Sequence, residues 1–342
     1  MSTETPLQNV HETDVIVIGA GPCGLFTVFE AGLLKWKCHL VDYLPNPGGQ
    51  CAEIYPKKPI YDIPGFPSVL AGDLVDNLIA QGAPFSPAFT LGERAEELLK
   101  LDDGTFRLTT TKGTIIHGKT VFLAGGLGCF EPRKPAISNI AEFEDHGVEY
   151  IIKDPGIYSG KRVIIGGGGD SALDWTIVLA DIAAHVTLVH RSDQFRAAPD
   201  SVSKARALAD QGRITMITDA QVTALAGEGA LSSVTITHND SATAELMVDH
   251  FIPLFGLSPK LGPIAQWGLA LDKNAVVVDP TNYMTTIEGM YAVGDICEYP
   301  NKLKLILSGF HEAAVALNHE YQRQHPEKKH VIKYTTVTGV PS

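Results

Sequence analysis

The sequence predicts an α/β protein with two Rossmann-like domains of three layers (ββα) each. Two observations predict this fold class. A buried strand, a glycine-rich loop, a helix and a second buried strand occur twice, over residues 14–42 and again over residues 162–191. A group of strands joined by short turns follows each copy. Since a strand–helix–strand unit forms a parallel sheet covered by its helix, the repeat predicts two such sheets.

The first copy of the strand–helix–strand unit covers residues 14–42. Residues 14–18 are almost entirely apolar and run into the loop Gly19–Gly24, after which a helix is expected over residues 25–34. A second apolar strand over residues 38–41 ends at Asp42. The strands expected after this unit cover residues 94–101, 106–111, 114–117 and 120–124.

The second copy has the same order of elements. An apolar strand over residues 162–165 leads into the glycines at 166–169, a helix over residues 171–183 and a strand over residues 185–189. The later strands are expected over residues 221–225, 233–238, 244–248, 251–254 and 290–293, and a long amphipathic helix over residues 305–324.

Composition excludes several classes of partner. The chain has 27 Lys+Arg against 39 Asp+Glu, a net charge of −12, whereas nucleic acids and anionic membranes attract dense positive charge. Residues 1–12 are polar and do not have the pattern of a signal peptide. The longest apolar runs are of strand length, far below the ~20 residues of a membrane span. We therefore expect no nucleic-acid or membrane partner and a cytoplasmic location.

The cysteines are widely scattered along the chain. The five are Cys23, Cys38, Cys51, Cys129 and Cys297, and no two have the C-x-x-C spacing. No group of cysteine and histidine has the spacing of metal ligands. We therefore expect no disulfide framework, no dithiol redox pair and no metal site.

The first glycine loop has the residues needed to bind a dinucleotide. Gly19 permits a tight turn, Gly21 lets a pyrophosphate approach the backbone, and Gly24 lets the helix pack on the strand. Asp42 stands where a carboxylate can accept hydrogen bonds from a ribose diol. The pattern predicts an adenosine dinucleotide with a free 2′-hydroxyl, and a glycine turn without a ligand is the alternative.

The second loop predicts a different nucleotide. Gly167, Gly169 and Ala172 form Gly-x-Gly-x-x-Ala, but the next strand ends in His190-Arg191 instead of an acid, and Arg196 follows. Guanidinium groups bind phosphate oxygens through two parallel hydrogen bonds. The loop therefore predicts a 2′-phosphate, and so NADPH in preference to NADH. A solvated charged loop is the alternative.

Four motifs carry a resemblance to a known group of proteins. The strings VIVIGAGPCGL, IIGGGGDSA, VHRSDQFRA and YAVGDI are similar to those of flavoproteins with two dinucleotide-binding domains, the group that includes thioredoxin reductase. The resemblance covers nearly the whole chain. It implies an FAD-binding domain over residues 1–124 and 253–342, with an NADPH-binding domain over residues 125–252 inserted into it. It also implies that Asp295 binds the ribityl and phosphate end of FAD.

The thiol pair of thioredoxin reductases is absent from this sequence. Residues 154–160 stand at its expected place, upstream of the second loop, and contain no cysteine. Cys51 stands alone near the region where other disulfide reductases place a dithiol beside the flavin. Because a disulfide relay needs thiolates, we expect no thiol chemistry. Electrons are then expected to leave one at a time to an external carrier.

Longer sequence strings resemble one particular family within this group. GGQ with IYPKKPIYDIPGFP, GGLGCFEPRK, GLSPKLGPIAQWGL and NKLKLILSGFHEA are similar to the thioredoxin-reductase-like ferredoxin–NADP⁺ reductases. This resemblance implies a homodimer, non-covalently bound FAD, and electron transfer between NADPH and ferredoxin or flavodoxin. The alternatives are an NADPH-dependent diaphorase that reduces quinones or flavins, and a non-catalytic NADPH-sensing flavoprotein.

The resemblance also implies the residues of both sites. Hydride transfer needs no catalytic acid or base, so none is assigned, and Tyr55 and Thr336 would flank the flavin. The residues implied for FAD are Gly19, Gly21, Cys23, Gly24, Asp42, Gln50, Tyr55, Ala95, Phe130, Asp295, Ile296 and Thr336. Those implied for NADPH are Gly167, Gly169, Asp170, Ser171, His190, Arg191 and Arg196.

An acidic electron carrier can dock on this acidic chain only where positive charge is concentrated locally. The candidate basic residues are Lys57, Lys58, Arg133, Lys134, Lys302, Lys304, Lys328, Lys329 and Lys333. Most of them stand in loops next to the segments expected to bind the flavin. The alternative is a solvated surface, the usual state of a short charge run.

Overall fold

A computed structural model describes residues 10–128, 131–258, 260–327 and 335–339 of the chain. The chain divides into two compact units. The split unit comprises residues 1–129 and 259–342, and the inserted unit comprises residues 130–258. The divisions fall a few residues after the predicted domain boundaries at 124/125 and 252/253.

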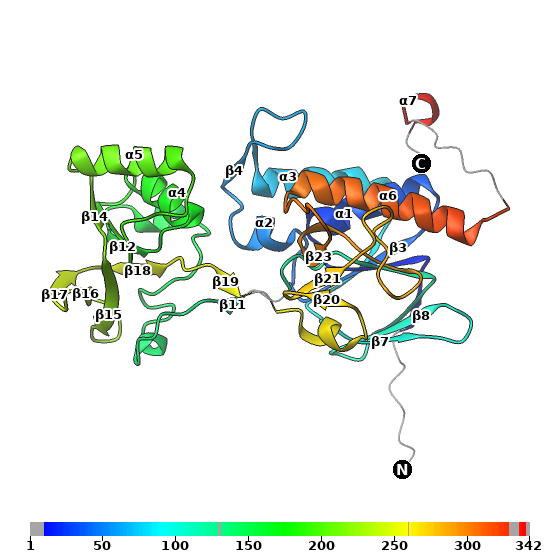
Figure 1. Ribbon diagram of the computed structural model, residues 1–342, viewed down its shortest axis with the longest axis horizontal. Coiled ribbons are helices and arrows are strands. Elements are labelled where there is room, and N and C mark those ends of the chain that lie inside the picture. The colour runs from blue at the N-terminus through cyan, green and yellow to red at the C-terminus, as the bar shows by residue number, and fades with distance from the viewer. Residues whose placement is uncertain (1–9, 129–130, 259, 328–334, 340–342) are drawn as a thin grey trace, which may run out of the picture. The chain divides into compact units, whose positions relative to one another are not determined.

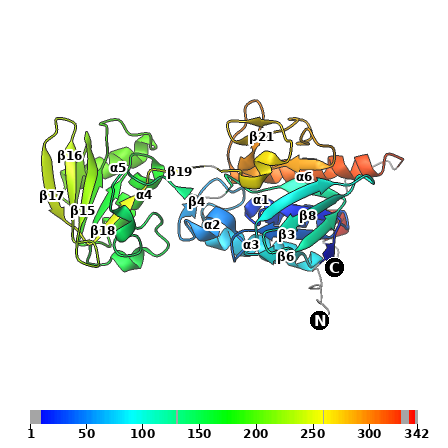
Figure 2. The ribbon, with the colours of Figure 1, turned by 90° about the horizontal axis from the view of Figure 1, so that it is seen from below.

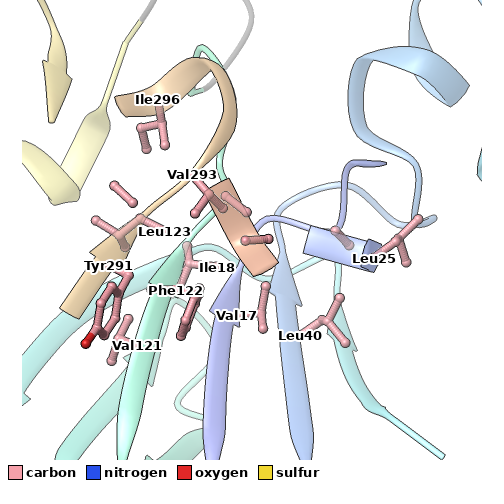
Figure 3. Close-up of a cluster of buried hydrophobic side chains, with 14 of the residues drawn as sticks. Val17, Ile18, Leu25, Leu40, Val121, Phe122, Leu123, Tyr291, Val293 and Ile296 are labelled. Carbon is pink, nitrogen blue, oxygen red and sulfur yellow. The ribbon is translucent and has the colours of Figure 1, made fainter. Parts of the chain in front are cut away.

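The split unit is built on a five-stranded parallel sheet in the order β22-β10-β2-β3-β6. Its strands are β22 (Met290–Ala292), β10 (Thr120–Leu123), β2 (Val15–Ile18), β3 (Cys38–Asp42) and β6 (Ala88–Leu91). The three inner strands are buried along nearly their whole length, which explains their continuous apolar sequences. Figure 3 shows Val17, Phe122, Tyr291 and Ile296 packed together in this core.

Two further layers cover this sheet. Helices α1 (Pro22–Leu33), α3 (Ala71–Gly82) and α6 (Ile306–Gln324) lie side by side, with α1 in the middle (Figure 1). The other layer is the sheet β1-β9-β8-β7, with strands β1 (Val10–Glu12), β9 (Ile115–Gly118), β8 (Phe106–Thr110) and β7 (Ala95–Lys100). The predicted three-layer ββα arrangement is thereby confirmed for this unit.

The inserted unit repeats the plan on a smaller scale (Figure 2). Its parallel sheet has the order β14-β13-β12-β18, formed by β14 (Ile214–Ile217), β13 (His185–Val189), β12 (Arg162–Gly166) and β18 (His250–Pro253). The two helices α4 (Asp170–Leu179) and α5 (Pro199–Asp210) pack against each other. The third layer is the antiparallel sheet of β15 (Ala220–Ala226), β16 (Ser233–His238) and β17 (Thr243–Met247).

The remaining elements are short. The helices are α2 (Gly49–Glu53) and α7 (Thr335–Thr338). The strands are β4 (Pro59–Ile60), β5 (Val69–Leu70), β11 (Glu131–Pro132), β19 (Leu257–Ser258), β20 (Leu271–Asp272), β21 (Ala275–Val277) and β23 (Cys297–Glu298). The 3₁₀ turns are η1 (Ala83–Phe85), η2 (Ile140–Glu142), η3 (Pro155–Tyr158), η4 (Gly262–Gln266) and η5 (Gly294–Ile296).

The structure corrects the predicted secondary structure at several points. The helix expected over residues 171–183 ends at Leu179, and the following residues form turns before β13. Helices α3 and α5 and strands β6 and β14 were not predicted. Helix α5 is largely polar: only Ala205 is buried, while Val202, Leu208 and Ala209 are partly buried against the same core.

Candidate functional site

The three glycines of the first loop have the three roles expected of a phosphate-binding turn. Gly19 has φ +107°, and a β-carbon there would lie 2.4 Å from the carbonyl oxygen of Ala124. A β-carbon on Gly24 would lie 2.0 Å from the carbonyl oxygen of Gly19, so this position needs glycine for packing. At Gly21 the nearest atom would be 3.9 Å away, in Gly49. The space beside Gly21 is therefore open, as an approaching pyrophosphate requires.

Asp42 ties this loop to the end of strand β3. Its carboxylate accepts hydrogen bonds from the backbone N–H of Ala20 at 2.6 Å and of Leu44 at 2.9 Å. Burial raises the pKa of Asp42, and these backbone hydrogen bonds oppose the rise. The backbone N–H of Glu93 donates to the carbonyl of Asp42, which brings the segment before the buried Ala95 next to the acid.

Two more segments meet at the same end of the parallel sheet. The backbone N–H of Gly48 donates to the carbonyl of Ala20 at 2.7 Å, so helix α2 begins beside the glycine loop. A β-carbon on Gly126 would lie 3.6 Å from the Nε2 atom of Gln50. The structure therefore brings Gln50 to the carboxyl ends of the strands, where ligands bind in such sheets.

Tyr55 is half-buried two residues after the end of α2, and its hydroxyl is 3.7 Å from the sulfur of Cys51. Burial raises the pKa of Tyr55, and the adjacent Cys51 raises it further. The phenol is therefore neutral at physiological pH. Phe130, the other ring expected near the flavin, lies outside the described residues. Thr336 is exposed in α7 and forms no hydrogen bond with another described residue, so its role stays a prediction.

The Gly294-Asp295 pair forms turn η5 directly after β22. Burial raises the pKa of Asp295, and the neighbouring Lys302 and Lys304 lower it. Ile296 is 1% exposed and packs in the hydrophobic core, so only its backbone can face a ligand. Sequence reasoning missed the buried Glu312 of α6, which accepts a 2.7 Å hydrogen bond from the backbone N–H of Gly294.

The cysteines within the described residues are unpaired and poorly suited to thiol chemistry. Burial raises the pKa of the Cys23 thiol to about 12, and it raises the pKa of Cys38, Cys51 and Cys297 as well. These thiols are therefore protonated at neutral pH, and the thiol is a much weaker nucleophile than the thiolate.

The second glycine loop has the same construction as the first. Gly167 has φ +145°, and a β-carbon there would lie 2.6 Å from the carbonyl oxygen of Leu254 and 3.0 Å from the β-carbon of Ala172. A β-carbon on Gly169 would meet nothing within 4 Å. The middle glycine again faces open space at the start of a helix, which fits a pyrophosphate.

The basic loop after β13 folds back over the second glycine loop. The His190 ring packs on Gly168, where a β-carbon would lie 2.2 Å from Nε2, and burial lowers the pKa of His190. The backbone N–H of Arg196 donates to the carbonyl of Gly168 at 2.8 Å. The side chains of Arg191 and Arg196 are exposed and form no ion pair with another described residue. Both guanidinium groups are therefore available to a phosphate.

The start of helix α4 is also tied to this basic loop. The carboxylate of Asp170 accepts a 2.8 Å hydrogen bond from the backbone N–H of Ala198. Ser171 is exposed in the first turn of the helix. The structure thus places both residues at the predicted nucleotide loop, although Asp170 already has a partner within the protein.

The expectation that Lys302 lies on a docking surface is wrong. Its side chain is 1% exposed, and its ammonium pairs with the carboxylate of Glu312. Lys134 pairs with Glu144, whereas Lys304 is exposed. Sequence spacing could not reveal that Lys302 turns inward, because its partner is brought in by helix α6.

The described part of the chain has neither a cluster of metal ligands nor a helix that could span a membrane. No group of three or more His, Cys, Asp or Glu side chains there could hold a metal ion. Among the same residues, no helix is both long and apolar enough to cross a membrane.

Comparison with known proteins places the chain in a class. Residues 13–319 match the model of the pyridine nucleotide-disulphide oxidoreductase family, and the chain belongs to this family. The fold agrees, since the thioredoxin reductase of T. acidophilum has a TM-score of 0.79 at 22% identity, over 92% of this chain and 99% of that one.

Similar proteins of known name indicate which members of this family the chain resembles. A protein of Christiangramia forsetii named ferredoxin–NADP reductase 2 is 64% identical over 332 residues, which cover 96% of this chain and 94% of the relative. A protein of Parvibaculum lavamentivorans named ferredoxin–NADP reductase is 49% identical over 330 residues, 96% of each chain. Within its family, this chain therefore groups with proteins that carry that name, as the sequence motifs predicted.

Proposed function

We propose that this protein is an FAD-dependent ferredoxin–NADP⁺ reductase. One observation carries the proposal: two glycine loops, each with its middle glycine facing open space, occur in a chain whose described cysteines are buried and unpaired. The first loop is followed by an acid and the second by two arginines, as FAD and NADPH require. The names of the similar proteins support the same activity.

The split unit is the FAD-binding domain in this proposal. The first glycine loop holds the pyrophosphate, Asp42 the adenosine ribose, and the backbone near Ala95 the adenine. Asp295 holds the ribityl end, while Gln50 and Tyr55 lie at the flavin ring. These assignments are supported by the convergence of their segments at one end of the parallel sheet.

The inserted unit is the NADPH-binding domain. The open space at Gly169 receives the pyrophosphate, and the start of α4 with Asp170 and Ser171 borders it. Arg191 and Arg196 bind the 2′-phosphate, and His190 shapes the loop between them. The nucleotide preference is supported by the exposure of both guanidinium groups.

The protein's own residues bind and orient rather than transfer protons. FAD held by these residues would supply the redox chemistry, the uptake of a hydride from NADPH and the release of single electrons to the carrier. Tyr55 stays neutral and presents an aromatic face, and no described cysteine has a thiolate that could divert the electrons. No side chain has to act as general acid or base in this scheme.

The partner is a small acidic one-electron carrier, ferredoxin or flavodoxin.

The protein acts as a homodimer in which Thr336 of the C-terminal segment lies near the flavin of the other subunit. It acts in the cytoplasm, which is supported by the absence of a disulfide among the described cysteines. Sedimentation velocity tests the homodimer, and a monomer at micromolar concentration would contradict it.

Anaerobic stopped-flow absorbance tests the activity itself. The protein loaded with FAD is reduced with one equivalent of NADPH and then mixed with ferredoxin, with flavodoxin, with thioredoxin or with a quinone. We expect rapid reduction of ferredoxin, two molecules per NADPH, because each takes one electron. Fast reduction of the quinone alone would favour the diaphorase. Reduction of thioredoxin would show that the protein uses thiol chemistry after all. Transfer to none of the acceptors would favour a non-catalytic sensor.

A further inference from the structure

Helix α6 carries two completely buried glutamates. Glu312 and Glu320 are both 0% exposed. They are eight residues apart, so they lie on the same face of the helix. A buried carboxylate is unfavourable unless it is paired and hydrogen-bonded, and both of these are. Their partners differ, and the difference points to a specific role for Glu312.

The partners of Glu312 all lie in the short segment that follows β22. Its Oε2 atom accepts a hydrogen bond from the backbone N–H of Gly294 at 2.7 Å. Its Oε1 atom accepts from the hydroxyl of Tyr299 at 2.7 Å and contacts the ammonium of Lys302. The thiol of Cys297 lies 3.5 Å from Oε2. One carboxylate therefore holds both ends of this segment.

Gly294 is also held by packing from the other side. It has φ +77°, and a β-carbon there would lie 2.9 Å from the sulfur of Cys23 in α1. A β-carbon on Gly309 of α6 would lie 2.2 Å from the same sulfur. Gly294 is thus held between two helices, and its own N–H, in the peptide that joins Val293 to Gly294, points toward Glu312.

The charge of Glu312 is balanced within the same segment. Burial by itself would lower the pKa of Lys302, but the adjoining Cys297 and Glu312 raise it overall, so the ammonium is charged. Lys302 also lowers the pKa of Asp295, whereas Glu312 raises it. The pair therefore places a strong hydrogen-bond acceptor beneath Asp295 without adding a net negative charge there.

We propose that Glu312, held by Lys302, is a positioning residue for the FAD site. It orients the Gly294 peptide, and through it the direction in which Asp295 points. The inference rests on the proposed function, because it takes Gly294-Asp295 as a contact of FAD. Buried ion pairs add little net stability and serve specificity in some proteins, which agrees with this role.

Glu320 supplies the matched control. Its carboxylate accepts from the hydroxyl of Tyr291 at 2.8 Å and from Arg323 at 2.6 and 2.7 Å. It has the same burial and charge as Glu312 and is likewise bonded to a tyrosine hydroxyl and a cation, but it has no hydrogen bond to the turn that carries Asp295. The two glutamates therefore separate support of the fold from positioning of the site.

The test compares Glu312→Gln with Glu320→Gln in the full chain. FAD is removed, the apoprotein is titrated with FAD by fluorescence, the visible spectrum of the bound flavin is recorded, and the apoprotein is unfolded in urea. We expect both variants to lose stability, but only Glu312→Gln to raise the Kd of FAD by at least about tenfold, with a shifted flavin spectrum. Equal changes in Kd for the two variants would overturn the inference.

A milder pair covers the case in which a glutamine variant fails to fold. Tyr299→Phe removes one hydrogen bond to Glu312, and Tyr291→Phe removes one to Glu320. We expect a several-fold rise in the Kd of FAD for Tyr299→Phe and none for Tyr291→Phe. No rise for Tyr299→Phe would overturn the inference while leaving the proposed function intact. A wild-type chain that takes up no FAD would overturn both.

Discussion

The backbone N–H of Ala20 donates a 2.6 Å hydrogen bond to the carboxylate of Asp42, which lies 22 residues further along the chain. The acid predicted to hold a ribose is therefore also part of the glycine loop's own structure. A second hydrogen bond, from the N–H of Gly48 to the carbonyl of Ala20, supports the loop from α2. The loop is thus held in shape by the protein alone, so that a phosphate finds its N–H donors already in place.

This geometry makes opposite predictions for two glycines of the loop. Gly21 has φ −74° and open space beside it, so Gly21→Ala should fold normally yet block the pyrophosphate. We expect a rise of at least about tenfold in the Kd of FAD, measured by titration of the apoprotein. Gly24→Ala should instead destabilise the fold by about 1–3 kcal/mol in urea unfolding, because its β-carbon would meet Gly19. An unchanged Kd for FAD in Gly21→Ala would contradict the assignment of this loop.

Arg191 and Arg196 are predicted to select NADPH over NADH. Each charge-assisted contact with the 2′-phosphate is worth about 1.5–3 kcal/mol, so Arg191→Ala and Arg196→Ala should each raise the KM for NADPH by about tenfold or more. The KM for NADH should hardly change, because NADH lacks that phosphate. Arg206→Ala, an exposed arginine of α5, is the control and should affect neither nucleotide. Equal losses for both nucleotides would mean that the arginines do not contact a 2′-phosphate.

Lys304 is expected to contribute to the docking of an acidic carrier. It is exposed and near enough to Asp295 to lower its pKa, so it marks surface close to the site. Lys304→Glu should raise the KM for ferredoxin at low salt, and the difference should shrink as salt screens the charges. Lys37→Glu is the control, since Lys37 is exposed just before β3, at the end of the strand away from the glycine loop. A salt-independent effect, or the same effect from Lys37→Glu, would place the docking surface elsewhere.

His39 should make the stability of the protein sensitive to acid. It is 2% exposed, hydrogen-bonded to Thr90 at 2.8 Å, and burial with the nearby His11 lowers its pKa to about 4. The unfolded chain takes up this proton below about pH 6.5, so stability should fall as the pH drops from about 6.5 to 4, by at most about 3 kcal/mol.

The variant His39→Gln isolates this contribution. In urea unfolding at pH 7 and pH 4.5, it should lose less stability between the two values than the wild type loses. His311→Gln, an exposed histidine of α6, should behave as the wild type does. The same pH dependence in His39→Gln and the wild type would show that another group is responsible.

The two nucleotide loops could be predicted from the sequence because their physics is local. Gly19, Gly21 and Gly24 lie within one turn between strand and helix, and their spacing predicts the tight turn at Gly19 and the close packing at Gly24 that the structure has. The approach of a pyrophosphate at Gly21 stays a prediction. The long apolar strands were equally clear, since strands buried on both faces have continuous apolar sequences.

The features that were missed depend on contacts far apart in the sequence. Lys302 stands next to Lys304 in a segment whose sequence suggests an exposed loop. Only the packing of α6 shows that Lys302 is buried in an ion pair with Glu312. Helix α3 is a different case: Ala71, Leu74, Val75 and Leu78 are buried at helical spacing, so the sequence did contain the signal for this helix. The position of Lys302, by contrast, is decided by tertiary packing rather than by local sequence.

The most direct test of the account is the reduction of cytochrome c by NADPH through the purified protein, with and without ferredoxin. We expect slow reduction without ferredoxin, a large stimulation when ferredoxin is added, and no reduction of thioredoxin above background. NADH should be much the poorer donor. Equal rates with and without ferredoxin, or turnover that depends on thioredoxin, would contradict the central claim that electrons pass from NADPH to a one-electron carrier without a thiol.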